Sequence, residues 1–265
     1  MKGLFSLAAA AASLVVSGSA EAASGDRLNF LACPQLYDTL PMNCWAAEYN
    51  GERYFIGAQR GPDSSYLPQM KHQVLVEGVV TDAPRVCGGI VLSPLRVSVL
   101  PELDLSCDGP VLSGDGLTPP TVAGRSPRTP LKPHPLHEGI GSFMLSDVPE
   151  PPYTTKQFRI DFDFGTDLLV DQMQKRMIEI WTYTKLAGTP KITVEGYTST
   201  TLLSDGNRLA EPEGLAERRA KKISGMLENL GAPNREISVT WVDSPEEPDG
   251  VHDAERRRVI VTIEP

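Results

Sequence analysis

The chain has 265 residues, of which 40% are hydrophobic, and its formal net charge at pH 7 is −9. This length predicts one or two domains, and the hydrophobic content is sufficient for packed cores. The negative charge would repel phosphate groups, which argues against a nucleic-acid partner.

Residues 1–22 are predicted to be a secretory signal peptide. Lys2 supplies a positive start, residues 3–16 form an apolar run too short to span a bilayer, and residues 20–22 (Ala-Glu-Ala) fit a cleavage site. An alternative is a lipoprotein cleaved before Cys33, but charged residues separate that cysteine from the apolar run. No later segment is apolar enough to cross a membrane. We therefore expect an exported, soluble protein of the periplasm, with outer-membrane association left open.

All four cysteines lie in the first half of the chain: Cys33, Cys44, Cys87 and Cys107. An even number of cysteines in an exported protein predicts two disulfides, and the sequence does not choose among the possible pairings. A metal site is the alternative, but the chain has no Cys-x-x-Cys and no His pair near these cysteines. We predict disulfides and no metal ligand.

Residues 26–110 are predicted to form a small β domain. Two strand-like runs, 44–49 and 52–56, flank Asn50-Gly51, a pair that accepts positive φ and strongly indicates a hairpin. Residues 73–80 and 95–100 are further strand candidates. Several short strands separated by turns favour a small barrel or sandwich, and we expect an OB-like barrel stabilised by the disulfides.

Four aromatic residues of this domain have two interpretations. They could form a binding face, or they could pack in the core and across strands, which is the commoner use of such residues. The four are Trp45, Tyr49, Tyr54 and Phe55. A binding face here would provide a contact for an envelope protein partner.

Residues 111–152 are predicted to be a linker. Their many prolines exclude a continuous helix or a sheet ladder. His134 and His137 lie three residues apart in this segment and could ligate a metal, but an isolated pair on a tether is more simply a solvated one. Residues 140–148 carry apolar side chains that could pack on either domain.

Residues 153–265 are predicted to form an α/β domain. Residues 158–164 alternate between apolar and polar, as in a strand with one buried face, and residues 167–187 show helical spacing. A strand at 191–195 follows, and we expect it to pair in parallel with the first strand through a right-handed crossover. A second helix is predicted over 213–230. Two final strands at 237–241 and 259–263 complete a mixed sheet with helices on one face.

The strand at 191–195 leads into Gly196 and a polar loop, and the helix after it carries paired arginines. The order of these residues resembles the OmpA C-terminal-like (OmpA/MotB) family, over about residues 155–265. The matching positions are Gly196-Tyr197-Thr198, Asn207, residues 215–220 (Leu-Ala-Glu-Arg-Arg-Ala) and Arg257-Arg258-Val259. The resemblance implies a two-layer OmpA-like fold and non-covalent binding of peptidoglycan, without a cofactor. One position departs from the pattern, because Ser199 stands where the family has Asp.

The resemblance also implies a site for the diaminopimelate residue of the peptidoglycan stem peptide. That ligand offers an ammonium and a carboxylate, so its site needs an anion and a bidentate cation. The resemblance assigns the cation to Arg219. Helical geometry agrees, because Arg219 lies at the edge of the apolar stripe and Arg218 points away from it. The alternative for Arg219 is an arginine at the edge of the core, paired with an internal acid.

The anion of this site is the open question, because Ser199 carries no charge at neutral pH. Asp205 lies in the same loop and could fold back to replace the missing carboxylate. The chain also has additional residues before Leu215, and their acids, including Glu211, could reshape the site or close over it. Asn207 could contact ligand or serve as a turn residue.

Three consecutive arginines precede the last strand. Strand alternation sends only one of them inward, and we assign Arg257 to the site; the alternative is a solvated basic edge. The predicted ligand-contacting set is thus Tyr197, Thr198, Ser199, Asp205, Asn207, Arg219 and Arg257.

These features lead to two hypotheses for function. The first is a periplasmic envelope protein that binds peptidoglycan through its OmpA-like domain. The second is an envelope structural or protein-interaction module whose OmpA-like fold has lost diaminopimelate binding, and Ser199 favours it. We predict no enzymatic activity, because Ser199 and His252 are distant in sequence and no motif joins them.

Overall fold

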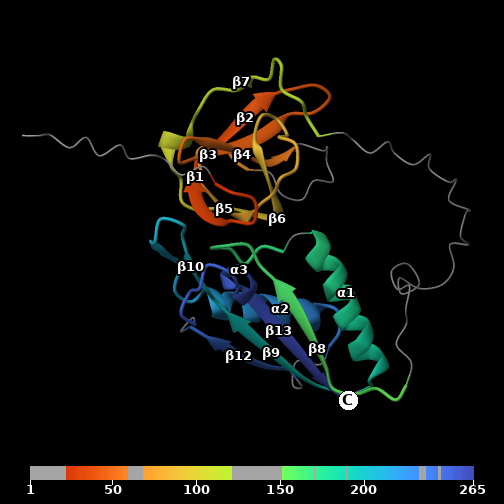
Figure 1. The fold of residues 1–265 in the computed structure, drawn as a ribbon. Helices are drawn as coiled ribbons and strands as arrows, with labels where there is room; N and C mark the ends of the chain where they lie inside the picture. The colour runs from red at the N-terminus through yellow and green to blue at the C-terminus, as the bar shows by residue number, and fades with distance from the viewer. Residues whose placement is uncertain are drawn as a thin grey trace, which may run out of the picture.

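The computed structural model describes residues 22–58, 68–120, 151–169, 171–188, 190–232, 237–243 and 246–265. Nearly all of the predicted signal peptide and most of the linker, with His134 and His137, lie outside these ranges. The described residues form a β barrel and an α/β domain that lie against each other (Figure 1). No helix in this part of the chain is both long and apolar enough to span a membrane.

The N-terminal domain is a seven-stranded, barrel-like β sheet, which we call the barrel. Its strands are β1 (Arg27–Ala32), β2 (Pro34–Asp38), β3 (Cys44–Tyr49), β4 (Glu52–Ala58), β5 (Val74–Val80), β6 (Ile90–Val99) and β7 (Leu112–Ser113). They are ordered β1-β5-β6-β4-β3-β2-β7, and only Cys33 separates β1 from β2. Strands β1 and β2, which follow each other in the chain, thus lie at or next to opposite ends of the strand order, as a curved, OB-like sheet allows.

The predicted hairpin is confirmed, because β3 and β4 pair antiparallel around Asn50 and Gly51, whose φ angles are 51° and 81°. The barrel also extends past the expected boundary at residue 110. Strand β7 pairs with β2, and the Cys87 N–H donates to the carbonyl of Thr118. The first residues of the predicted linker therefore belong to the barrel.

The aromatic side chains of the barrel serve mainly as packing. Tyr54 and Trp45 are buried in the barrel core. Tyr49 stacks on Phe30 at 4.6 Å between ring centroids, and the partly buried Phe55 packs against a second buried cluster. The interpretation as cross-strand and core packing therefore holds, and the alternative of an exposed aromatic binding face does not.

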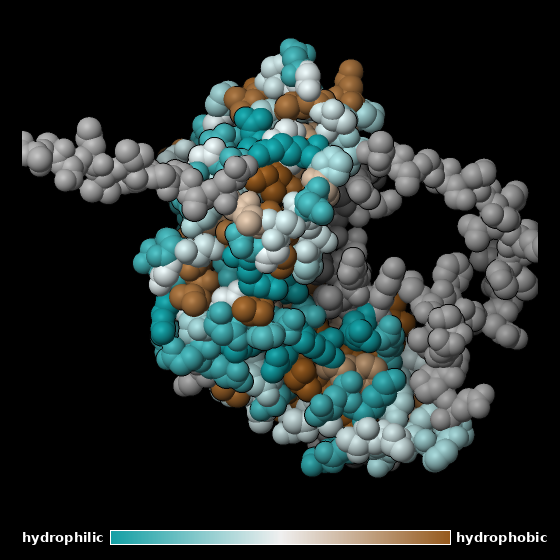
Figure 2. Space-filling model, viewed as in Figure 1, coloured by the Kyte–Doolittle hydropathy of each residue, from teal (hydrophilic) through white to brown (hydrophobic). Residues whose placement is uncertain are grey.

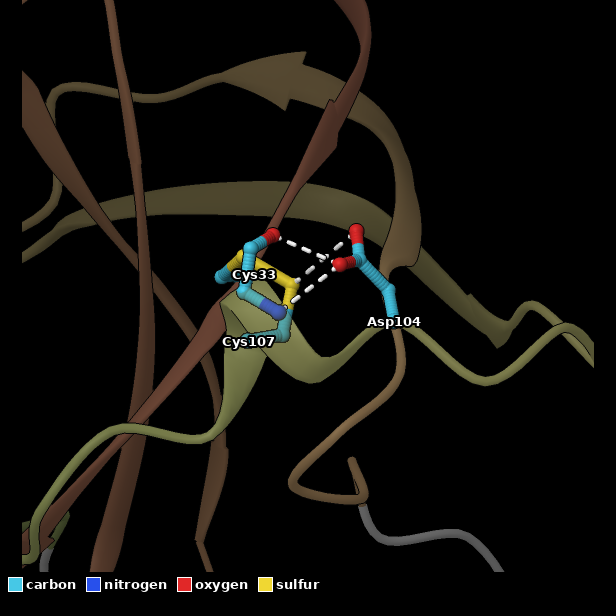
Figure 3. The surroundings of a disulfide bond; sticks show 4 residues. Cys33, Asp104 and Cys107 are labelled. Carbon is cyan, nitrogen blue, oxygen red and sulfur yellow. Dashed lines mark hydrogen bonds between the residues drawn. A yellow bond between two sulfur atoms is a disulfide. The ribbon is translucent and has the colours of Figure 1, made fainter.

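Two disulfides tie the barrel together, as predicted. Cys44 in β3 pairs with Cys87, and Cys33 pairs with Cys107 in the short helix η1 (Leu105–Cys107). Figure 3 shows the second bond beside Asp104, whose carboxylate caps η1 by accepting from the Ser106 N–H. Because the sulfur of Cys33 is used in this bond, the structure argues against a lipoprotein anchored at that residue.

The C-terminal domain is a four-stranded mixed sheet with its two long helices packed against the sheet's core face. Its elements are β8 (Lys156–Asp161), α1 (Asp171–Leu186), β9 (Lys191–Tyr197), β10 (Thr200–Leu202), β11 (Arg208–Ala210), α2 (Leu215–Asn229), β12 (Ile237–Val242), α3 (Asp253–Arg256) and β13 (Arg258–Glu264). The sheet order is β12-β9-β13-β8, and α1 and α2 contribute to a single core with it.

Three expectations for this domain need correction. Strands β8 and β9 are not hydrogen-bonded neighbours, because β13 lies between them antiparallel to both; the parallel pair is β9 with β12. The second helix, expected over 213–230, spans 215–229, and Leu230 just beyond it is 41% exposed. Part of the expected polar loop instead forms the β10–β11 hairpin.

Gly196 does not end its strand, as the sequence suggested, but lies within β9. A Cβ atom at this position would lie 2.1 Å from the carbonyl oxygen of Ala216 and 3.0 Å from the Cβ of Ala220. Glycine is therefore needed here because α2 approaches the sheet too closely for any side chain. That approach places the start of α2 over the end of β9, where the polar residues gather.

The barrel contacts the C-terminal domain through β1, β5 and β6 (Figure 1). An apolar cluster joins Leu75 and Leu100 of the barrel to Phe164 and Leu203. The two domains are also joined by hydrogen bonds and by a buried ion pair, described below. On the face shown in Figure 2, hydrophobic residues form separate patches among hydrophilic ones, so that view does not single out one docking surface.

Candidate functional site

The centre of the candidate site is an ion pair between Arg219 and Glu211, whose side chains are both 0% exposed. Arg219 lies in the second turn of α2, on the face that carries Ala216 and Ala220 into the core. Its Nη1 donates to Glu211 Oε2 at 2.9 Å and its Nη2 to Oε1 at 2.6 Å. This is the bidentate geometry in which a guanidinium holds a carboxylate most specifically.

Two backbone N–H groups complete the surroundings of the Glu211 carboxylate. The Gly165 N–H donates to Oε1 and the Ser199 N–H to Oε2, both at 2.9 Å. We call these donors, the Arg219 guanidinium with the N–H groups of Gly165 and Ser199, the cradle. Each carboxylate oxygen thus accepts two hydrogen bonds from the cradle, which is close to the full capacity of a carboxylate.

The remaining donors of Arg219 are also used. Nε donates to the carbonyl of Thr166 at 2.9 Å, Nη1 to that of Tyr197 at 3.0 Å and Nη2 to that of Asp163 at 3.0 Å. The guanidinium therefore makes five hydrogen bonds and has no N–H left for a further ligand. Its central carbon also lies 5.0 Å from the centroid of the Phe162 ring.

The anion of the site is Glu211, not Asp205. The carboxylate of Asp205 accepts instead from the backbone N–H and the side-chain amide of Asn207, and both residues are exposed in the turn between β10 and β11. Asn207 therefore has the turn role that the sequence allowed. Glu211 belongs to the additional residues before Leu215, which we call the insertion. Its carboxylate covers the Arg219 guanidinium, as the hypothesis that an acid closes over the site expects.

The position of Glu211 explains why residue 199 can be serine. Ser199 is 1% exposed, and besides its N–H contact its carbonyl accepts from the backbone N–H of Glu211 at 3.2 Å. An aspartate at 199 would bring a second buried carboxylate next to the first, and like charges in a shared site disfavour ionisation.

The other predicted site residues lie around the cradle without converging on it. Tyr197 contributes its carbonyl to Arg219, but its hydroxyl donates to Glu195, and burial together with that bond raises the pKa of Tyr197 to about 12. Thr198 is buried between Tyr197 and Ser199. Arg218 is exposed, as predicted from its helical position, and donates to the carbonyl of Glu213.

Arg257 is the inward-facing arginine of its triplet, as expected, and is 0% exposed. Its partner is Glu77 of the barrel, to which its Nη2 donates. Its Nε and Nη1 are buried without a hydrogen-bond partner among the described residues. Arg257 thus belongs to the contact between the domains, and the sequence of the C-terminal domain alone contained no signal for this partner.

The carboxyl of Asp163 interacts electrostatically with both buried arginines, Arg219 and Arg257. Burial raises the pKa of its carboxyl, and the charges of Arg96, Arg257 and Arg219 offset that rise in part. A second acid missed by sequence reasoning is Asp253, which is 1% exposed and accepts from the backbone N–H of Leu202. Asp163 is thus close to both buried ion pairs, whereas Asp253 holds the backbone of Leu202 and Gly250 and pairs with Arg256.

Ser199 and His252 take part in separate interactions. The Ser199 hydroxyl donates to the carbonyl of Thr200, and the His252 ring pairs with Asp249 on the surface. Among the described residues, no group of three or more His, Cys, Asp and Glu side chains is arranged to hold a metal ion.

Comparison with known proteins yields fold neighbours only. No family model matches the chain, and no curated protein matches its sequence. Solved structures that resemble it include the OmpA-like domain of FopA1 from Francisella tularensis, with 19% identity, 41% of this chain and 71% of that chain covered, and a TM-score of 0.34.

Two further neighbours have the same TM-score of 0.34. The peptidoglycan-associated lipoprotein from Burkholderia pseudomallei is 21% identical, with 40% of this chain and 90% of that chain covered. The periplasmic domain of MotB from Helicobacter pylori is 18% identical, with 43% and 79% covered. Scores at this level do not transfer a function, so the functional proposal below is built on the residues of the site.

Proposed function

We propose that this chain is an exported cell-envelope protein whose C-terminal domain acts as a structural or protein-interaction module. The observation that carries the proposal is the closed pair of Glu211 and Arg219, in which the arginine expected to grip a stem-peptide carboxylate already holds one. The envelope location is supported by the predicted signal peptide and by two disulfides, which persist in oxidising compartments.

Glu211 has two advantages over an external carboxylate in binding to Arg219. It lies four residues before Leu215, where α2 begins, so a short loop sets its effective concentration at the cradle, on the order of millimolar or higher. An external ligand would also lose translational and rotational freedom on binding, which Glu211 does not. To bind here, a free stem peptide must displace the tethered Glu211 carboxylate and also offset its own loss of translational and rotational freedom.

A second candidate is peptidoglycan binding after Glu211 has left the cradle. The cradle itself favours this candidate, because a guanidinium and two backbone N–H groups converge on a carboxylate whatever its source. The resemblance to the OmpA C-terminal-like family, carried by Gly196-Tyr197-Thr198 and Arg219, points to the same ligand. In this candidate the stem-peptide carboxylate takes the place of Glu211.

Co-sedimentation with purified, insoluble peptidoglycan separates the two candidates. We expect the wild-type mature protein to stay in the supernatant, together with the control Glu213→Gln, which changes an exposed acid of the same insertion. Retention of Glu211→Gln alone would mean that the cradle still accepts the wall once its own carboxylate is weakened. Retention of the wild type, lost in Arg219→Lys, would overturn the proposal in favour of peptidoglycan binding.

A further inference from the structure

The cradle and the barrel share one short segment of chain, Asp163–Thr166, which we call the junction segment. On its barrel side, the Phe164 N–H donates to the buried hydroxyl of Ser98 in β6 at 3.0 Å. The Phe164 ring packs in the apolar cluster with Leu75 and Leu100 of the barrel. Phe164 is thus fixed by the barrel through both its backbone and its side chain.

On its other side, the junction segment builds the cradle. The carbonyls of Asp163 and Thr166 accept from Arg219, and the Gly165 N–H donates to Glu211. Phe164 therefore faces the barrel while the residues on both sides of it contact the buried ion pair. A displacement of the junction segment at the barrel must therefore also move the groups that bind Arg219 and Glu211, and the reverse.

The β10–β11 hairpin makes a second connection of the same kind. On the barrel side, the Asn29 side chain donates to the carbonyl of Leu202, and the Asn29 N–H donates to the Ser204 hydroxyl at 2.9 Å. At the other end of the hairpin, Ser199 and Glu211 flank its two strands and bond to each other. Both chain segments that supply backbone donors to Glu211 are therefore held by the barrel.

The buried pair of Glu77 and Arg257 lies in the same interface. Arg257 also lies over the ring of Phe164, with 5.6 Å between its central carbon and the ring centroid. Separation of the domains would leave this guanidinium without its carboxylate. Removal of the Glu77 carboxylate should therefore destabilise the contact between the two domains, because it leaves a buried arginine without its counter-ion.

We propose that docking of the barrel keeps the cradle closed around Glu211, and that separation of the two domains releases Glu211 and opens the cradle to an external carboxylate. The barrel is then an intramolecular lock on the site. This inference rests on the proposed closure of the cradle by Glu211. Its physical basis is a coupling between two arrangements that share the junction segment and the hairpin.

Amide hydrogen exchange, followed by NMR on the full mature chain without ligand, tests this coupling. The Gly165 and Ser199 amides report on the cradle because they donate to Glu211. We expect Glu77→Gln to speed their exchange by about 5–150-fold, the usual range for coupled sites. The Val261 amide in the core strand β13 should keep its protection.

A second variant guards against a failure of the first to fold. Asn29→Ala removes the side-chain contact to the hairpin from the barrel surface, and we expect the same faster exchange at Gly165 and Ser199. The control Glu179→Gln, which opens an exposed ion pair with Arg176, should leave both amides unchanged. Unchanged protection of both amides in both interface variants would overturn the inference.

The two proposals fail in different ways. Retention of the wild type on peptidoglycan contradicts the proposed function, whereas the exchange experiment contains no ligand. Unchanged exchange in the interface variants contradicts the lock alone and leaves the closed cradle in place.

Discussion

Removal of the Glu211 carboxylate should destabilise the C-terminal domain severely. In Glu211→Ala, the buried Arg219 guanidinium would keep its charge but lose its counter-ion, and the Ser199 and Gly165 N–H groups would lose their acceptor. Breaking a buried ion pair from one side costs about 3–5 kcal/mol. Whole proteins are stable by only about 5–15 kcal/mol, so this single change removes a large share.

Thermal unfolding measures this cost, with the fluorescence of Trp181 and Trp241 reporting on the C-terminal domain. For a chain of this length we expect the melting temperature to fall by about 6–20 °C, because each kcal/mol corresponds to about 2–4 °C. The matched control is Glu179→Ala, which breaks an exposed pair with Arg176 and should cost about 0–1 kcal/mol. A fall in melting temperature in Glu211→Ala that is no larger than in this control would refute the closed cradle.

Three further predictions test other parts of the structure. Replacing Cys44 and Cys87 by serine should cost about 4 kcal/mol of unfolding free energy, because the disulfide closes a loop with a sequence separation of 43; equal urea midpoints for both proteins would contradict this. Gly196→Ala should cost about 1–3 kcal/mol or more in thermal unfolding, because its Cβ would lie 2.1 Å from the carbonyl oxygen of Ala216, and an unchanged melting temperature would refute that close approach. Burial raises the pKa of Asp163 in the folded state, so its ionisation lowers stability as pH rises from the ordinary value of 3.8 through the folded pKa. Asp163→Asn should therefore gain stability at neutral pH, and the gain should shrink as pH falls through the raised folded pKa and vanish near 3.8; a gain independent of pH would contradict the assignment.

The parts of the fold that follow from local patterns were predictable. The Asn50-Gly51 hairpin follows from residues that accept positive φ, and the buried faces of β8 and β13 follow from strict alternation. The inward position of Arg219 follows from helical spacing. In each of these cases, the residues that determine the structure are neighbours in the sequence.

The parts that depend on distant contacts were not predictable. Alternation cannot tell that β13 lies between β8 and β9, because sheet order is decided by long-range pairing. Gly196 reads as a strand breaker in sequence, although its real constraint is the carbonyl of Ala216 on a later helix. The partner of Arg257 lies in another domain, and the sequence does not indicate that the two domains touch.

The anion of the site was only half predictable. The absence of the family's Asp at Ser199 and the presence of extra acids before Leu215 were both visible in the sequence. The choice among Asp205, Glu211 and Glu213 required the turn between β10 and β11, which ties Asp205 to Asn207 and leaves Glu211 to face Arg219.

Glu211 binds the Arg219 guanidinium in the way that a ligand carboxylate would. A crystal of the protein soaked in diaminopimelate tests this most directly. We expect that electron density at the cradle still shows the Glu211 carboxylate on the guanidinium, with both oxygens held as in the unsoaked protein. Density for a diaminopimelate carboxylate against Arg219, with Glu211 displaced, would contradict it.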